Sequence, residues 1–215
     1  MASFDTIVTP VESKADLNAF IALPKRLYAG HKGYVAPLDV ERREAFTPGK
    51  NPLFEHVEVR FFLARRAGKV VGRISAQIDR AHLERYGDST GHFGCLAAED
   101  DPAIFAALFA AAEGWLRAKG MKHVTGPFSL SVNEEVGLLI HGFDSRPVLM
   151  VPYDPPYSGP RVEACGYVKA KDVFSYDYDV QNAPETIGAK LLARGGLEGR
   201  VKVRTANMKM FDAEV

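Results

Sequence analysis

The side chains best suited to chemistry gather in segment 125–157, which is dense in Gly, Pro, Asn and Tyr. The amide of Asn133 can orient a polar substrate, and the phenol of Tyr153 or Tyr157 can donate a proton. Because a phenol has a pKa of about 10, such a proton transfer requires close alignment with the acceptor. A turn in which both tyrosines pack against prolines explains them equally well, so both interpretations stay open.

The polar residues around Asn133 also have two explanations. Ser131 followed by Glu134 is typical of a capping box, in which the two side chains satisfy the first N–H groups of a helix. Asn133 would then be a solvated amide at a helix start, and Glu134 a capping partner rather than a base. Glu135 is free of capping, but a solvated helix face accounts for it as well as a catalytic role does.

Composition bounds the class of protein. The 215 residues carry 27 basic and 27 acidic side chains, so no basic excess of the kind a nucleic-acid binder needs is present. The longest nearly pure apolar run, 104–112, is too short to span a bilayer, and no signal peptide is visible. Cys95 and Cys165 stand alone and predict buried thiols of a reducing compartment. We predict a cytoplasmic protein and leave peripheral membrane contact open; the sequence indicates no oligomeric state.

Several well-known catalytic motifs are missing. The chain has no Gly-x-Gly-x-x-Gly after a strand, no phosphate-binding Gly-x4-Gly-Lys-Ser/Thr loop and no Gly-x-Ser-x-Gly elbow. The six histidines show no paired metal-ligand spacing, and no His is followed at five residues by Asp. These absences leave chemistry that works by positioning and proton transfer, without a metal or an obvious nucleophile.

Hydrophobic periodicity predicts an α+β fold. The strongest element is a helix over 102–119, opened by Asp101 and Pro102, with an apolar stripe from Ile104 to Leu116 that predicts core. Further helices are predicted from Ser13 onward, at 39–46, 132–142 and 184–192, with a turn at 163–166. Strands are predicted at 4–9, 57–65, 69–79, 91–98, 123–128, 147–151, 167–179 and 201–204.

This order of elements resembles the GNAT fold of acyl-CoA-dependent N-acyltransferases, over roughly residues 4 to 180. The GNAT fold is a mixed central sheet flanked by helices, in which two neighbouring strands splay apart. The sequence Glu163-Ala-Cys-Gly-Tyr167 is similar to the Glu-x-x-Gly-Phe/Tyr that commonly precedes the final GNAT strand.

A tighter resemblance lies in Gly126-Pro-Phe128, Ser131-Val-Asn-Glu134, Gly137-Leu-Leu, Gly142-Phe-Asp144 and Pro152-Tyr-x-Pro-Pro-Tyr157. These sequences are similar to a bacterial GNAT-like subgroup that includes the bacterial ceramide synthases and that usually runs to a longer, two-part chain. By this resemblance, residues 1–180 are an acyltransferase domain, and 181–215 are a linker and the start of a truncated second half.

The resemblance implies an N-acyltransferase that moves an acyl group from a thioester of CoA or an acyl carrier to an amine. Within the subgroup, a long-chain acyl group and a sphingoid-type lipid amine are favoured, and no metal is needed. The implied donor-binding residues are Gly126, Pro127, Phe128, Ser129 and Ser131, and the implied catalytic residues are Asn133, Glu135, Tyr153 and Tyr157. His92 and Glu99 lie on or beside the strand that supplies a water-linked base in many GNAT enzymes, although packing and an acidic helix start explain them more simply.

One departure from the GNAT pattern concerns the donor. Many of these enzymes bind the CoA pyrophosphate with a glycine-rich loop at the start of the long helix, where backbone N–H groups face the anion. Here that position reads Leu96-Ala-Ala-Glu-Asp-Asp-Pro102, whose three carboxylates would repel a pyrophosphate. Two alternatives therefore remain: a non-catalytic GNAT-like module that binds a ligand or a partner, and an N-acetyltransferase of a small polar amine.

Overall fold

A computed structural model of the chain describes residues 5–145, 148–176, 178–179, 181, 190 and 204–214. The chain divides into two compact units, Met1–Asp172 and Val173–Val215. Among the described residues, all strands belong to the first unit, and the second contains the 3-10 helix η2 (Met208–Met210) and the short helix α7 (Phe211–Glu214). The domain boundary near residue 180 and the truncated second half stay predictions.

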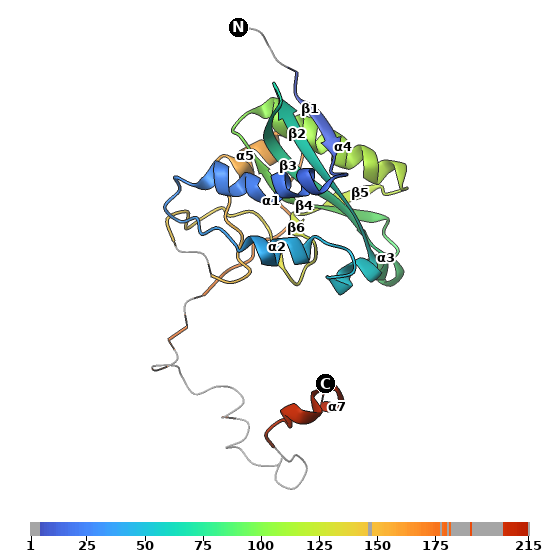
Figure 1. Cartoon of the computed structure of the whole chain (residues 1–215), viewed down its shortest axis with the longest axis vertical. Coiled ribbons are helices and arrows are strands. Elements are labelled where there is room, and N and C mark those ends of the chain that lie inside the picture. The colour runs from blue at the N-terminus through green and yellow to red at the C-terminus, as the bar shows by residue number, and fades with distance from the viewer. Residues whose placement is uncertain are drawn as a thin grey trace. The chain divides into compact units, whose positions relative to one another are not determined.

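The first unit is built on one mixed sheet of five strands in the order β1-β2-β3-β4-β5 (Figure 1). Neighbouring strands run antiparallel except for β4 and β5, which are parallel. The turn between β2 and β3 consists of Ala67 and Gly68, both with positive φ, as a tight hairpin requires. The strands are β1 (Ile7–Pro10), β2 (Val57–Arg66), β3 (Lys69–Asp79), β4 (Thr90–Ala98) and β5 (His123–Thr125).

Helices cover both faces of this sheet. Phe62 and Ala64 of β2 belong to a core cluster with α4 (Pro102–Ala118), while Leu63 between them packs with Phe20 of α1 (Lys14–Tyr28). Because successive side chains of a strand point to opposite faces, α4 and α1 lie on opposite sides of the sheet. Helix α1 crosses its face beside α2 (Asp39–Ala45) (Figure 1).

The long helix α4 forms as its sequence predicts. Asp101 accepts a hydrogen bond from the Ala103 N–H, Pro102 occupies the first turn, and Leu108 and Leu116 are fully buried. Smaller elements include α3 (Arg80–Tyr86), which the sequence analysis missed, and α5 (Ser158–Ala164), where only a turn at 163–166 was predicted. A 3-10 helix, η1, spans Pro52–Glu55. In the described part of the chain, no helix combines the length and apolarity that crossing a bilayer requires.

Strand β4 contains a bulge near its carboxyl end. Ser75 of β3 pairs with Gly94, but Arg73 pairs with Ala97, so Cys95 and Leu96 together face a single residue of β3. Cys95, in the bulge, has a φ of 48°, a positive value of the kind that bulge residues adopt. A bulge interrupts the ladder and leaves backbone groups of the extra residue unpaired with the neighbouring strand.

Beyond the bulge, the chain after β5 folds back over β4. Strands β4 and β5 pair only as far as His92 and Thr125, and the two-residue strand β6 (Phe128–Ser129) then pairs with β7 (Glu135–Val136) in a small separate sheet. The Phe128 carbonyl lies against Gly94, and it accepts a 2.7 Å hydrogen bond from the Gln77 side chain. This contact attaches β6 to the middle of the main sheet.

Three predicted elements after residue 130 are wrong, and a fourth, the strand over 123–128, is shorter than predicted. The helix over 132–142 is absent, because Ser131 closes a local turn with Asn133 and Glu134, β7 pairs with β6, and Gly137 takes a φ of 84°. Residues 148–151 form no strand. Residues 167–176, expected in a long strand, have no pairing partner among the described residues, and the predicted strand 123–128 is interrupted after Thr125.

The last two predicted elements fall almost entirely outside the described residues. These are the helix over 184–192, of which only Lys190 is described, and the strand over 201–204, of which only Arg204 is described.

Candidate functional site

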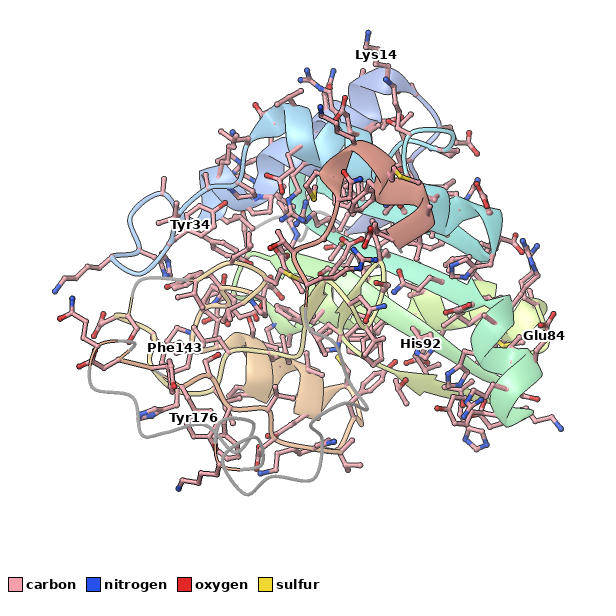
Figure 2. All side chains as sticks on the ribbon, turned by 90° about the horizontal axis from the view of Figure 1, so that it is seen from below. Lys14, Tyr34, Glu84, His92, Phe143 and Tyr176 are labelled. Carbon is pink, nitrogen blue, oxygen red and sulfur yellow. The ribbon has the colours of Figure 1, made fainter. Side chains whose placement is uncertain are left out.

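A cavity of about 100 Å³ lies on the α1 side of the sheet, next to the β4 bulge. Its walls come from α1, the loop before α2, α2 itself, β3 and β4, and the chain between Pro127 and Asp154. Figure 2 shows Tyr34 and Phe143 on the same side of the molecule, away from Glu84 and α3. The polar side chains that line the cavity include Tyr34, Arg42, Arg73, Glu135, Tyr153 and Asp154.

Unpaired hydrogen-bond donors are concentrated here. Within the described part of the chain, three buried side-chain polar atoms have no hydrogen-bond partner: the Tyr34 hydroxyl, Arg42 Nε and Arg73 Nε. All three residues line this cavity. An unsatisfied buried donor costs about 1–3 kcal/mol, so three at one place indicate a site that a ligand or solvent completes.

An ion pair forms one wall of the cavity. Arg42, on α2, donates to the Glu135 carboxylate of β7 over 2.7 Å, and both side chains are mostly buried. The pair joins the helix that covers the sheet to the small β6–β7 sheet. Glu135 thus contacts the cavity as a carboxylate already held by one cation.

Arg73 projects from the middle of β3, next to the bulge. Its Nη1 donates to the Phe20 carbonyl of α1 over 2.7 Å, and its guanidinium lies 4.7 Å from the centre of the Phe20 ring. Burial lowers the pKa of Arg73 from its usual value. Among the ion pairs of the described residues, none includes Arg73, so its charge lacks a carboxylate in contact.

Asp154 is the buried acid of the site. Its side chain accepts a 3.1 Å hydrogen bond from the Leu139 N–H, and the residue is 6% exposed. Burial raises the pKa of Asp154 to about 7, the Leu139 hydrogen bond opposing that rise. A carboxyl with this pKa can take up or release a proton near neutral pH, as a general base must.

The two predicted tyrosines have different environments. The Tyr153 hydroxyl lies 2.7 Å from His31 Nδ1, and its ring joins a cluster with Tyr28 and Tyr34 on the cavity wall. Desolvation raises the pKa of Tyr153, so the phenol keeps its proton at neutral pH. The protonated hydroxyl shares its hydrogen bond with His31, which lies outside the cavity lining.

Tyr157 serves the core instead. Its hydroxyl donates to the Ala98 carbonyl at the end of β4 over 2.8 Å, and its ring contacts Phe105 of α4 edge-on. Burial raises the pKa of Tyr157 to about 12. Tyr157 is outside the cavity lining, so the structure separates the two phenols that the sequence grouped together.

The remaining predicted residues divide in the same way. Pro127, Ser129 and Glu135 line the cavity, whereas Gly126, Phe128, Ser131 and Asn133 do not. Asn133 is exposed, and it lies in the local turn that its N–H closes with the Ser131 hydroxyl.

Cys95 lines the cavity as a buried thiol. Its N–H donates to the Ser129 hydroxyl over 3.3 Å, and burial raises the pKa of the thiol. A raised pKa disfavours the thiolate, so Cys95 is not an activated nucleophile. Cys165 is partly buried, and burial raises its pKa as well.

His92 lies away from this site, on the opposite side of the view from Tyr34 (Figure 2). Its Nδ1 is 2.9 Å from the Thr125 hydroxyl, and its ring packs edge-on against His82 and Phe128. Burial, with the nearby His82, lowers the pKa of His92 to about 4, so the ring is neutral under ordinary conditions. The structure thus agrees with the simpler interpretation, in which His92 is a packed side chain.

The start of α4 is partly occupied. The Asp101 side chain accepts a hydrogen bond from the Ala103 N–H, and the acidic residues here are paired with basic side chains. The pairs are Glu99 with Arg26 (3.3 Å) and Lys69 (3.0 Å), Asp100 with Arg161 (2.8 Å), and Asp101 with Arg66 (2.7 Å). The cations neutralise much of the predicted repulsion, but capping by Asp101 and the missing donor of Pro102 still leave few N–H groups for a pyrophosphate.

Sequence reasoning missed Arg42, Arg73, Tyr34 and Asp154. Arg73 had a signal, since it stands inside the apolar strand 69–79, where a charged residue is unusual unless it has a task. Asp154 stood between the two selected tyrosines and was passed over as part of a turn. Arg42 and Tyr34 lie in segment 30–53, and nothing local links that segment to residues a hundred positions away.

Comparison with known proteins supports the fold and the family resemblance. No family model matches the chain. The chain is 50% identical to "Bacterial ceramide synthase" of Caulobacter vibrioides over 98% of its own length and 55% of the relative. It is 46% identical to "Protein YghO" of Escherichia coli over 82% of its length and 45% of that relative. The chain thus spans about half the length of the curated relatives it matches.

A solved structure has the same fold. A tandem GNAT protein from the clavulanic acid biosynthesis pathway, in its form without AcCoA, superposes with a TM-score of 0.50. The match covers 75% of this chain and 43% of that one, at 16% sequence identity. At this identity the match speaks for the fold alone, and it confirms the predicted GNAT-like α+β architecture.

Proposed function

We propose that this chain, which has the GNAT fold and resembles the bacterial ceramide synthases, holds the amine-binding part of an N-acyltransferase site. The observation that carries the proposal is the cavity at the β4 bulge, where the buried Asp154 carboxyl and three unpaired donors line one space. This combination suits a reaction in which an amine loses a proton while a carbonyl oxygen gains charge.

The reaction forms one bond and breaks one. The amine nitrogen attacks the carbonyl carbon of the acyl thioester, the C–N bond forms, the C–S bond breaks, and the thiolate leaves. Asp154 takes the proton that the amine loses, because its pKa of about 7 leaves a substantial fraction ionised at neutral pH. The thiolate receives a proton in turn, and we assign its supply to Tyr153, one of the phenols that line the cavity.

Polarisation of the carbonyl is assigned to the bulge. Leu96 lines the cavity at the position where β4 is out of register with β3, and backbone N–H groups freed by a bulge can face a ligand. One such donor is typically worth about 10²–10³ in turnover. Orientation of the amine against the thioester supplies a further part of the rate.

The donor is a thioester of CoA or of an acyl carrier. The capped start of α4 supports a pyrophosphate position different from that of the glycine-rich loop, or a carrier that needs no such position. An acyl carrier would be recognised by protein surface instead.

The acceptor is a lipid amine. Exposed apolar side chains lie at or next to cavity residues in the sequence. Val35 lines the cavity and is 65% exposed. Leu149 and Met150, which precede the lining residue Val151, are 87% and 51% exposed, respectively. A hydrocarbon chain could leave the polar cavity over these side chains, and a membrane surface could contact them. Together with the ceramide synthase resemblance, this rim favours a sphingoid-type amine over a small polar amine.

A donor and acceptor panel tests the proposal. The chain is incubated with acetyl-CoA or palmitoyl-CoA and with sphinganine or ethanolamine, and amide formation is measured by mass spectrometry. We expect palmitoyl transfer to sphinganine, abolished in Asp154→Asn but kept in Asp172→Asn, an exposed carboxylate. Acetyl transfer to ethanolamine alone would instead support the small-amine enzyme. Binding of palmitoyl-CoA without amide formation would support the non-catalytic module.

A further inference from the structure

We propose that His31 is a positioning residue for departure of the thiolate. It acts through Tyr153, to which it transfers a proton while the phenol protonates the leaving sulfur. The inference rests on the proposed function, but it concerns only the thioester side of the reaction and not the amine. It gives a task to a histidine that contacts a cavity residue without lining the cavity itself.

The two side chains are in direct contact, although 122 positions separate them in the chain. His31 Nδ1 lies 2.7 Å from the Tyr153 hydroxyl oxygen, within the distance that proton transfer requires. Tyr153 lines the cavity, whereas His31 lies outside the lining and is half-buried. The pair therefore connects the cavity to a side chain that solvent reaches.

Aromatic and backbone contacts fix this pair. The Tyr28 ring packs edge-on against the rings of both His31 and Tyr153, at centroid distances of 5.9 and 5.7 Å. The His31 N–H donates to the Tyr28 carbonyl over 2.9 Å, and the Tyr34 N–H donates to the His31 carbonyl over 3.1 Å. Tyr28 is 3% exposed at the end of α1. The histidine is thus attached to the packed part of the molecule.

The relative acidity of the groups explains why a second proton donor is useful. Desolvation, with Asp144 and Asp154 nearby, raises the pKa of Tyr153 from its usual value. A phenol is already a weaker acid than a thiol, so Tyr153 alone would protonate the thiolate uphill in free energy. An imidazolium is a stronger acid than a thiol. If Tyr153 gains a proton as it gives one up, no tyrosinate forms and the overall transfer is downhill.

The protons and electrons of this step balance. As the C–S bond breaks, its electron pair goes to the sulfur, and the sulfur binds the hydroxyl proton of Tyr153. The Tyr153 oxygen binds the Nδ1 proton of the His31 imidazolium, which becomes a neutral imidazole. Water then returns one proton to His31. Both residues end the cycle unchanged, and the thiol product carries the one proton that solvent supplied.

Matched acyl donors test the inference. Transfer of palmitate to one fixed amine is compared between two thioesters that both lack a nucleotide. The N-acetylcysteamine thioester releases an alkyl thiolate that needs a proton, whereas the 4-nitrothiophenyl thioester releases a thiolate that leaves without one. We expect His31→Ala to lower kcat/KM by about 10² with the alkyl donor and by less than about threefold with the aryl donor. Tyr153→Phe should show the same dependence on the donor.

Further variants separate a relay from a merely structural contact. His31→Asn keeps a hydrogen-bond donor for the phenol but has no proton to transfer, so it should be as slow as His31→Ala. Added imidazole should restore the alkyl reaction in His31→Ala but not in Tyr153→Phe. The double variant should be no slower than Tyr153→Phe alone, because the two residues act in one relay. His141→Ala is the control, since His141 is an exposed histidine outside the cavity lining.

Three outcomes would overturn the relay: wild-type rates in His31→Asn, equal losses with both donors in His31→Ala, or a double variant that shows the product of the two single losses. The same assay separates the relay from the proposed function. Asp154→Asn should slow both donors alike, because Asp154 serves the amine. If Asp154→Asn is inactive while His31→Ala uses the alkyl donor at the wild-type rate, only the relay fails. If the wild type forms no amide from either donor, both proposals fail.

Discussion

The main sheet with α4 and the segment 126–157 are stabilised in different ways. The sheet and helix bury an apolar cluster in which Ile74, Ile104 and Leu108 are fully inaccessible. Segment 126–157 contains two-residue strands and turns, with positive φ at Leu130 and Met150. Packing therefore holds the first region, and individual polar contacts hold the second.

Those polar contacts reach far along the sequence. Gln77 binds the Phe128 carbonyl, and Arg42 of α2 binds Glu135. Each contact places a cavity wall by fixing a loop to a rigid element. One substitution in the apolar core can therefore unfold the domain, whereas loss of a single polar contact can disrupt the cavity while the fold remains intact.

The largest expected effect is on the packed region. Leu108→Asp places a charge in the cluster under α4, where the residue is fully buried. The cost of several kcal/mol is comparable to the whole stability of a domain, so we expect no cooperative thermal transition by circular dichroism. Leu149→Asp is the control, because Leu149 is 87% exposed and should melt within a few degrees of the wild type. A Leu108→Asp protein with native-like melting would contradict the packed core.

The next effect breaks the site while sparing the fold. Asp154→Asn removes the proposed base and should lower turnover by about 10²–10⁴. Because the pKa of Asp154 is raised to about 7, the ionised form is needed for catalysis, and wild-type activity should rise through about pH 7. A flat pH–rate profile between pH 5 and pH 8 would argue against this role.

The same residue makes stability depend on pH in the opposite direction: as pH rises, activity should increase and the contribution of Asp154 to stability should decrease. The folded protein holds the Asp154 proton that the unfolded chain releases near pH 4, so this group's stabilising contribution is present at low pH and is lost as pH rises toward about 7. Asn cannot ionise. The melting temperature of Asp154→Asn relative to wild type should therefore increase from pH 5 to pH 8.

The two tyrosines give a smaller and sharper test of the comparison. Tyr153→Phe removes a cavity phenol and its contact with His31, and should lower turnover by about 10² while costing no more than about 1 kcal/mol of stability. Tyr157→Phe removes the hydrogen bond to Ala98 and should cost about 1 kcal/mol of stability while keeping activity. If Tyr157→Phe is the inactive protein and Tyr153→Phe the less stable one, the two regions have been assigned the wrong way round.

The smallest effect is expected at Asn133. Its side chain is exposed and outside the cavity, so Asn133→Ala should change kcat/KM by less than about twofold and leave melting unchanged. Steady-state kinetics on the active pair of substrates measures this. A loss above tenfold would mean that the 131–134 turn closes over the bound substrate, and would restore the role that the sequence suggested.

The sequence predicts the first region well for a physical reason. Apolar and polar residues alternate over 57–79, and apolar residues recur at helical spacing from Ile104 to Leu116. In each pattern, many residues independently indicate the same buried face. Asp101 and Gly120 mark the two ends of one helix, and the structure places that helix over Pro102–Ala118. The short elements α3 and η1 were missed, because each continues directly from or into a neighbouring element without a distinct hydrophobic pattern of its own.

Segment 126–157 was predicted poorly because its conformation depends on distant partners. Ser131 and Glu134 match a capping box locally, but pairing of β7 with β6 and the contact of Glu135 with Arg42 favour a turn. The segment was predicted to hold the site, and three of its predicted residues, Tyr153, Glu135 and Ser129, line the cavity. Arg42, which pairs with Glu135, and Arg73, which lines the same cavity, come from α2 and β3, and the spacing of residues in those elements does not indicate that they meet segment 126–157.

The contact between Gly94 and β6 has a consequence for how related sequences can diverge. A Cβ at Gly94 would lie 1.7 Å from the Phe128 carbonyl oxygen, where no side chain fits without lifting β6 from the sheet. Any heavier residue at this position would move the wall that carries Ser129. Substitutions among the residues that line the cavity can therefore adapt such a protein to new amines. Position 94 must remain glycine, because the position of β6 depends on it.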